Sequence, residues 1–226
     1  MADGCLLYYI TDRTQFRGDE SARRRALLAK IVEAARAGVD YIQLREKDLS
    51  ARKLEVLASD ALAAVRNSAS PRTENREPRT RLLINSRTDI ALAIGADGVH
   101  LRADDVAPPE VRQMLELSAH RQLATDHFVV AASCHTAADV LRAESEAADF
   151  AVFAPVFGKR GATGTPPAGL AALQEACRAK IPVFALGGVT IENAASCLDA
   201  GAAGVAGIRL FQENKIEDVV RALRAR

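Results

Sequence analysis

A repeated junction between helix and strand constrains the fold of this chain more than any other feature. Four times, an alanine-rich helical stretch ends in Gly or Ala, a small or acidic residue follows, and a short apolar strand begins. Glycine after a helix end favours a left-handed cap, from which a tight loop can lead into a buried strand. The junctions lie at residues 37–44, 95–101, 147–153 and 201–208. They predict helices and strands that alternate around one parallel sheet.

The rest of the chain continues this alternation. Eight short apolar segments are typical of strands buried on both faces, and a helical stretch follows each. The first strand is not followed by the Gly-x-Gly-x-x-Gly turn of a doubly wound dinucleotide fold. We therefore predict an α/β fold, a single (β/α)8 TIM barrel over residues 1–226. The expected strands are residues 6–11, 41–44, 82–85, 98–101, 128–132, 150–153, 182–186 and 204–208, and the expected helices are residues 22–37, 51–66, 88–94, 108–118, 136–146, 168–179, 191–200 and 215–225.

Composition and charge narrow the range of partners. Thirty basic residues against 29 acidic ones give a net charge of +1, so no overall field would recruit nucleic acid. The sequence lacks both a long apolar run and the plan of a signal peptide. Four scattered cysteines argue against a disulfide framework or a zinc site. We expect a cytoplasmic protein that binds neither nucleic acid nor membranes, that can form a homo-oligomer, and that has a mobile loop at residues 67–80.

Polar residues collect where the predicted strands end, which is where barrels of this kind hold their active sites. Gln43, Arg45 and Lys47 alternate at the end of the second strand, so in an extended chain they would share one side and form a pocket for an anion. The other strand ends carry amides, hydroxyls, carboxylates and cations. These residues are Thr11, Asp12, Asn85, Ser86, Arg87, His100, Arg102, Asp105, Ser133 and His135.

Two glycine-rich stretches indicate phosphate binding. Gly187-Gly188 precedes a predicted helix whose first turn includes Thr190, and the last strand ends in Gly207-Ile208-Arg209. Together these turns are typical of the phosphate site in such barrels. The loop after strand six carries Lys159 and Arg160, and we interpret it as a lid whose cations close over a polyphosphate. Asp105 is a candidate ligand for Mg²⁺, which prefers one or two carboxylates plus substrate phosphate oxygens.

These residues match motifs of a known family. Over essentially its whole length the chain resembles thiamin phosphate synthase and its close relative, the thiazole tautomerase. The most specific motifs are Gln43-Leu44-Arg45-Glu46-Lys47 and the Gly-Ala-Asp-Gly-Val-His-Leu stretch at residues 95–101. Further matches are at residues 9–12, 84–87, 89–91, 154–157 and 185–189, and at Ser133 with His135.

The resemblance implies a reaction that joins two phosphorylated heterocycles. Hydroxymethylpyrimidine diphosphate would lose pyrophosphate, and the nitrogen of a thiazole phosphate would attack the resulting cation. Such a step needs electrostatic stabilisation of a departing anion more than acid–base chemistry. By similarity, Gln43, Arg45, Lys47 and Asn85 would hold the diphosphate substrate, Asp105 would bind Mg²⁺, Ser133 would contact the leaving group, and the backbone N–H groups of Gly188 and Ile208 would bind the thiazole phosphate. Arg45, Lys47 and Ser133 would thus be the catalytic groups.

The chain departs from the family pattern at three places. Ser86 stands where the synthase usually has an aspartate that serves as a second metal ligand, and it is a weaker ligand. The Pro-Thr-x-Thr-Lys loop of the family is replaced by residues 158–162, where Lys159 and Arg160, with Thr163 or Thr165 further on, are the available substitutes. Arg209 replaces a small hydroxyl residue and adds a cation beside the thiazole phosphate.

These departures keep two alternatives open. The tautomerase shifts a double bond in a carboxylated thiazole phosphate and needs proton transfer rather than metal, so His135 would be its acid–base group. A non-catalytic barrel that binds a thiazole or thiamin phosphate would keep the phosphate turn but lose the diphosphate cations. This chain keeps both sets of residues, and Gln43, Arg45, Lys47 and Asp105 favour the synthase.

Overall fold

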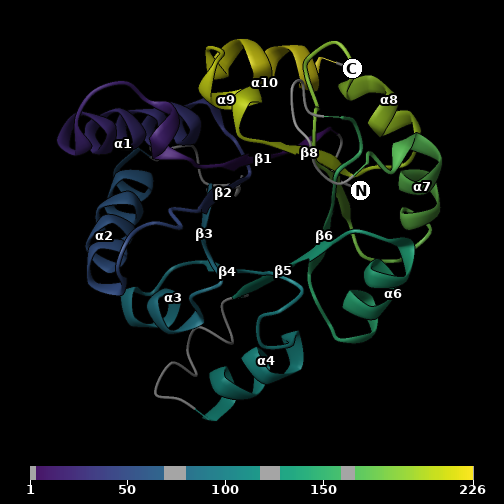
Figure 1. Cartoon of the computed structure of the whole chain (residues 1–226), viewed down its shortest axis with the longest axis horizontal. Coiled ribbons are helices and arrows are strands. Elements are labelled where there is room, and N and C mark those ends of the chain that lie inside the picture. Colours follow the sequence, from purple (N-terminus) through teal and green to yellow (C-terminus); the bar gives the residue numbers. More distant parts are fainter. Residues whose placement is uncertain (1–3, 69–79, 118–127, 159–165, 226) are drawn as a thin grey trace, which may run out of the picture.

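Eight parallel strands close into a barrel in chain order, with the helices as an outer ring (Figure 1). This computed structural model describes residues 4–68, 80–117, 128–158 and 166–225. The predicted (β/α)8 barrel is therefore confirmed.

The strands are β1 (Leu6–Ile10), β2 (Tyr41–Leu44), β3 (Arg81–Asn85), β4 (Gly98–Leu101), β5 (Val129–Cys134), β6 (Phe150–Phe153), β7 (Val183–Ala185) and β8 (Gly204–Gly207). The helices are α1 (Glu20–Ala37), α2 (Ala51–Ser68), α3 (Thr88–Ile94), α4 (Pro108–Leu117), α6 (Ala137–Ser145), α7 (Gly169–Ala176), α8 (Ala194–Asp199), α9 (Arg209–Gln212) and α10 (Ile216–Arg224), with a 3-10 turn, η1, at Arg13–Gln15.

The acidic residue of the repeated junction ties neighbouring strands together. Asp40, Asp97 and Asp149 each precede an even-numbered strand, and each carboxylate accepts a hydrogen bond from a backbone N–H of the strand before it, at 2.7, 2.8 and 2.6 Å. Gly38 and Gly95 cap the preceding helices in the left-handed conformation. The junction therefore recurs because it ends a helix and anchors the next strand within a few residues.

Alternation along the strands separates two apolar cores. One face packs against the helices, and the other fills the barrel interior. Tyr8, Tyr41, Phe150 and Phe184 form an aromatic cluster inside the barrel, with ring centroids 4.8 Å apart for Phe150 and Phe184. This cluster fills the barrel below the strand ends, so the carboxyl rim is the face that a small ligand can enter. None of the helices described in these four ranges is long and apolar enough to cross a membrane.

Several element boundaries differ from the prediction. β5 continues to Cys134, two residues further than expected, because Ser133 and Cys134 pair with β6. α2 continues to Ser68, so the predicted loop at residues 67–80 begins later, and residues 69–79 lie outside the described ranges. Prediction missed η1 and α9, since elements of three and four residues carry no periodic signal.

Candidate active site at the carboxyl rim

Four polar side chains form a layer inside the barrel above the aromatic cluster. Gln43 follows the inward-facing Tyr41 by two residues, Asn85 follows Leu83, and Ser133 follows Ala131. His100 joins them through its hydrogen bond to Ser133, from Nε2 to Oγ at 2.7 Å. The layer therefore comes from β2, β3, β4 and β5, which are consecutive in the barrel. Since these side chains face inward where four strands end, Gln43, Asn85 and Ser133 can contact one small molecule from one side.

The amides of the layer are arranged in a short chain of hydrogen bonds. Gln43, which is 1% exposed, donates from Nε2 to Asn85 Oδ1 at 3.0 Å, and Asn85 Nδ2 donates to Ser86 Oγ at 3.0 Å. Ser86 has φ +62°, in the left-handed region that serine adopts less readily than aspartate or asparagine. The predicted neighbours Gln43, Asn85 and Ser86 are thus brought together.

The cations after β2 lie in different environments. The strand ends at Leu44, and Lys47 stands exposed in the following turn, so the predicted strand-like alternation of Gln43, Arg45 and Lys47 does not extend to Lys47. Arg45 is half-buried, and its backbone N–H donates to Thr11 Oγ1 at 3.0 Å. Burial lowers the pKa of the Arg45 guanidinium. A partly desolvated arginine interacts strongly with an anion that replaces its lost water.

An ion-pair network centred on the buried Arg13 holds the turn that follows β2. Arg13, 4% exposed, donates to Glu46 Oε2 at 3.1 Å and to both Asp48 oxygens at 2.6 and 2.8 Å. Glu46, 1% exposed, also accepts from Thr11 Oγ1 at 2.6 Å. The hydrogen bonds that Arg13 donates to Asp48 and to other carboxylates raise the pKa of its guanidinium. Sequence reasoning gave Arg13 no role, because nothing local to residues 12–15 shows that Glu46 lies beside it.

Replacing Asp48 by asparagine should make folding stability less sensitive to acid. The hydrogen bond from Arg13 holds the pKa of Asp48 below its ordinary value of 3.8. A depressed folded-state pKa contributes stability above the unfolded value and loses it as the pH falls through the folded value. Asp48 is 57% exposed, so we expect a difference of less than about 1 kcal/mol at pH 6 that shrinks toward pH 3. Urea unfolding of both proteins from pH 3 to 7 measures this, and a difference that grows in acid would contradict it.

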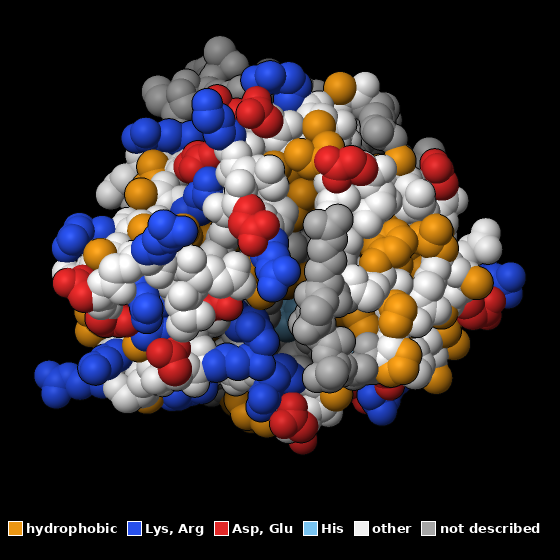
Figure 2. Space-filling view, turned by 45° about the horizontal axis from the view of Figure 1, so that its top comes forward, with side chains coloured by type: hydrophobic (Ala, Val, Ile, Leu, Met, Phe, Trp, Pro, Cys, Tyr) orange, Lys and Arg blue, Asp and Glu red, His pale blue; other side chains and the backbone are white. Residues whose placement is uncertain are grey.

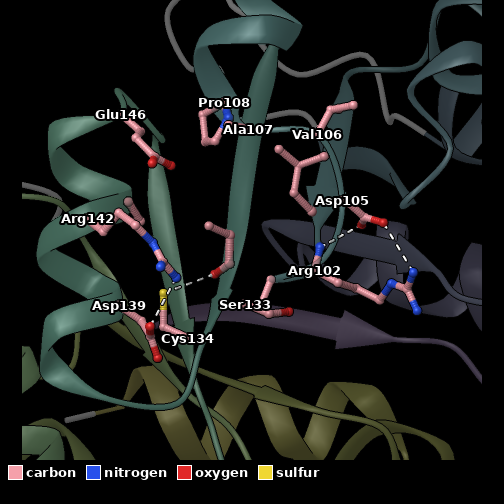
Figure 3. Close-up of a pocket in the computed structure, with 14 residues that line it drawn as sticks. Arg102, Asp105, Val106, Ala107, Pro108, Ser133, Cys134, Asp139, Arg142 and Glu146 are labelled. Atoms are coloured by element: carbon pink, nitrogen blue, oxygen red, sulfur yellow. Dashed lines mark hydrogen bonds and ion pairs between the residues drawn. The ribbon is translucent and has the colours of Figure 1, made fainter.

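Arg102 holds the carboxylate of Asp105 in place. Its carboxylate accepts from the backbone N–H of Arg102 at 2.7 Å and from Arg102 Nη2 at 3.2 Å (Figure 3). Asp105 and Ser133 line a cavity of about 210 Å³ that the ends of β4 and β5 form with helix α6. Asp105 also shares a second, open cleft with Ser86. The two predicted metal ligands, Asp105 and Ser86, therefore line the same cleft. In the described ranges no group of three or more His, Cys, Asp or Glu side chains could hold a metal alone.

His135 lies just beyond β5 and faces solvent. Its Nδ1 is 2.7 Å from the backbone oxygen of Ala154, which can only accept, so Nδ1 donates this bond. Nε2 of a neutral His135 is then the nitrogen that can accept a proton. Its backbone N–H donates to Asp139, which also forms the capping box of α6 with Thr136. His135 therefore has a fixed ring orientation at the rim.

The glycine turn after β7 packs tightly against the loop after β6. Gly187 and Gly188 have φ +98° and +65°, and a Cβ on Gly188 would lie 2.8 Å from Phe157 Cβ and 2.9 Å from Gly158 O. Only glycine fits both the conformation and the space. The predicted helix start is wrong here: Thr190 belongs to a turn closed by Asn193, and α8 begins at Ala194. The six-residue α8 thus does not place its N-terminus at Gly188.

The remaining predicted site residues differ in exposure, and some of them lie outside the described residues. Ile208 is half-buried and directly precedes α9, while Arg209 is exposed and lies 3.8 Å from Glu213. Figure 2 shows Lys and Arg side chains gathered beside a hollow in the middle of one face. Lys159, Arg160, Thr163 and Thr165, predicted to belong to a lid, lie outside the described residues.

Comparisons with known proteins show the family to which the chain is similar. The family model described as thiamine monophosphate synthase matches residues 7–211. Thiamine-phosphate synthase of Methanoculleus marisnigri is 36% identical over 227 residues, covering 99% of this chain and 95% of that protein. Thiamine-phosphate synthase of Syntrophomonas wolfei is 34% identical over 223 residues, covering 96% and 94%.

A solved structure shows the same fold. Thiamine phosphate pyrophosphorylase from Pyrococcus furiosus superposes with a TM-score of 0.74 at 24% identity, covering 98% of this chain and 94% of that chain. The family model and the relatives at more than 30% identity confirm the family expected from the motifs at residues 43–47 and 95–101. The chain belongs to the thiamine monophosphate synthase family.

Proposed function

We propose that this protein is a transferase of thiamin biosynthesis that joins hydroxymethylpyrimidine diphosphate to thiazole phosphate and releases pyrophosphate. The observation that carries the proposal is the inward-facing layer of Gln43, Asn85 and Ser133 beside the half-buried Arg45. Neutral donors and one desolvated cation at the end of a closed barrel suit a diphosphate leaving group attached to a polar ring. The activity for which the relatives are named supports the same proposal.

The proposed reaction has two steps: pyrophosphate departs from the pyrimidine, and the thiazole nitrogen then captures the methylene carbon. As the bond from the pyrimidine methylene carbon to the diphosphate oxygen breaks, negative charge grows on the leaving oxygens, and Arg45, Lys47 and the Ser133 hydroxyl stabilise it. Gln43 and Asn85 orient the pyrimidine and its diphosphate. The thiazole nitrogen then donates its electron pair to the methylene carbon and forms the new bond. Gly188, Ile208 and Arg209 bind the thiazole phosphate, and Lys159, Arg160 and Thr163 cover the pyrophosphate.

The donor set fits a Mg²⁺ ion that is shared with the substrate. Each Asp105 oxygen accepts one bond from Arg102, which leaves lone pairs on both oxygens, and Ser86 Oγ lines the same cleft. One carboxylate and one hydroxyl suit an ion that completes its shell with diphosphate oxygens and water. When bound, the ion would neutralise charge on the leaving pyrophosphate.

The location we propose is the cytoplasm, in keeping with four free cysteines.

Asp105→Ala should abolish or strongly weaken magnesium-dependent turnover, because it removes the only carboxylate that we assign to the ion. Ser86→Asp should tighten Mg²⁺ binding without harming the rate, since aspartate adopts the left-handed backbone at position 86 more readily than serine. Calorimetric titration of Mg²⁺ in the presence of pyrophosphate measures the affinity separately from the activity. An Asp105→Ala enzyme with unchanged rate and affinity would remove the metal role of Asp105.

The fixed, exposed ring of His135 favours the tautomerase as second candidate. Its Nε2 is oriented to take a proton from a ligand at the rim. One paired assay decides between the candidates. The purified protein with Mg²⁺ receives both phosphorylated heterocycles in one reaction and the carboxylated thiazole phosphate alone in another. We expect thiamin phosphate in the first reaction, whereas isomerisation in the second without product in the first would establish the tautomerase instead.

A further inference from the structure

Three side chains form a hydrogen-bonded chain from the barrel interior to the rim. The Tyr8 hydroxyl lies 3.0 Å from His100 Nδ1, and His100 Nε2 lies 2.7 Å from Ser133 Oγ. Tyr8 is fully buried and His100 is 3% exposed, whereas Ser133 is half-buried beside the cavity. They come from β1, β4 and β5. Tyr8 and His100 do not line the cavity beside Ser133, so we assign them an effect that acts through the serine.

Burial sets the protonation states of Tyr8 and His100. Burial raises the pKa of Tyr8 well above 10.0, so the phenol keeps its proton. Burial is also the largest influence on His100 and lowers its pKa to about 3; the charge of Arg45 lowers it further and that of Asp105 raises it. A charged ring would donate to Tyr8 from Nδ1, and the phenol proton would then have no acceptor among the hydrogen bonds of the described residues. The imidazole is therefore neutral and carries one proton, on Nδ1 or on Nε2.

Only one of these tautomers satisfies every buried donor. If Nδ1 carried the proton, it would donate to Tyr8, and the phenol proton would have no other acceptor among the hydrogen bonds of the described residues. An unsatisfied buried donor is costly. If Nε2 carries the proton, Tyr8 donates to Nδ1 and Nε2 donates to Ser133 Oγ. The second arrangement uses all the donors, so it is the stable one.

The proton of the Ser133 hydroxyl is then not used inside the protein. Because its oxygen accepts from His100, its own proton is free to be donated to another acceptor. We propose that Tyr8 and His100 are positioning residues that fix Ser133 as a hydrogen-bond donor aimed at the leaving diphosphate. This inference rests on the proposed function for its ligand, but the proton arrangement itself does not depend on which substrate is used. The buried pair means that Ser133 need not reorient when an anion arrives.

Imidazole nitrogen NMR tests the tautomer directly. In the ¹⁵N-histidine-labelled full-length protein, the His100 signals are assigned by their loss in His100→Asn. We expect a neutral ring with the proton on Nε2 throughout pH 5 to 8. Tyr8→Phe removes the donor to Nδ1 and should yield a mixture of tautomers. A wild-type His100 with its proton on Nδ1, or a charged ring in this range, would overturn the proposal even if Tyr8→Phe failed to fold.

Kinetic measurements test whether Tyr8 affects catalysis through Ser133. Tyr8→Phe should lower kcat roughly fivefold, about the value of one neutral hydrogen bond, and this loss should vanish in a Ser133→Ala background. Tyr41→Phe is the matched control, since Tyr41 belongs to the same aromatic cluster and should leave kcat unchanged. An equal loss from Tyr8→Phe with and without Ser133 would indicate a structural role only and overturn the inference. If the wild type made no thiamin phosphate, the proposed function would fail while the NMR result still decided the tautomer.

Discussion

Arg13→Met should lower the free energy of unfolding by about 3 to 5 kcal/mol, the usual cost of leaving one partner of a buried ion pair uncompensated. Glu46 would stay buried at 1% exposure while losing the guanidinium bond at 3.1 Å. The backbone N–H of Arg13 and the hydroxyl of Thr11 would still donate to it, but neither carries a compensating charge. Urea unfolding at pH 7 measures the change.

Two further variants make this result interpretable. Arg221→Met removes an exposed arginine of an α10 ion pair, Arg221 with Asp218 at 3.4 Å, and should cost no more than about 1 kcal/mol. Combining Arg13→Met with Glu46→Gln removes the buried charge but keeps an oxygen that accepts from Thr11, so part of the loss should be recovered. A loss of less than about 1 kcal/mol in Arg13→Met alone would mean that water reaches Glu46 and that the network does not support the turn after β2.

Arg45→Met should lower kcat roughly 100- to 1,000-fold, as expected when a preorganised group that stabilises developing charge is removed. Arg45 is already half-buried, so it has given up part of its water before the diphosphate departs. Its interaction with the growing negative charge is correspondingly stronger than that of an exposed cation. Steady-state kinetics with both heterocycles measure kcat and KM separately.

The choice of comparison variants separates charge from geometry. Arg45→Lys keeps a positive charge but loses the planar fork, so its rate should lie between the wild type and Arg45→Met. Arg66→Met removes an arginine near the end of α2, where it bonds the Gly95 carbonyl on the opposite rim of the barrel, and should leave kcat unchanged. If Arg45→Met raised KM alone, Arg45 would bind the substrate equally in ground and transition states and would not be a catalytic group.

Sequence reasoning found the rim residues but not the groups that hold them. Gln43, Asn85 and Ser133 could be predicted because strand ends and period-two alternation are local properties. His100 was visible as a strand-end histidine, but its link to Tyr8 spans 92 residues and required knowledge of how β1 faces β4. The fixed orientation of His135 likewise depends on the Ala154 carbonyl at the end of β6.

The sequence by itself determined the (β/α)8 architecture and the family of this protein. Four helix-to-strand junctions and short apolar strands act within a few residues of one another, so their meaning does not depend on distant contacts. Only the tertiary structure decided which polar groups become partners. Burial of Arg13 against Glu46, the hold of Arg102 on Asp105 and the Tyr8–His100–Ser133 chain depend on barrel closure and on side-chain directions. Closure brings residues far apart in sequence within hydrogen-bond distance, and no periodicity encodes which of them will meet.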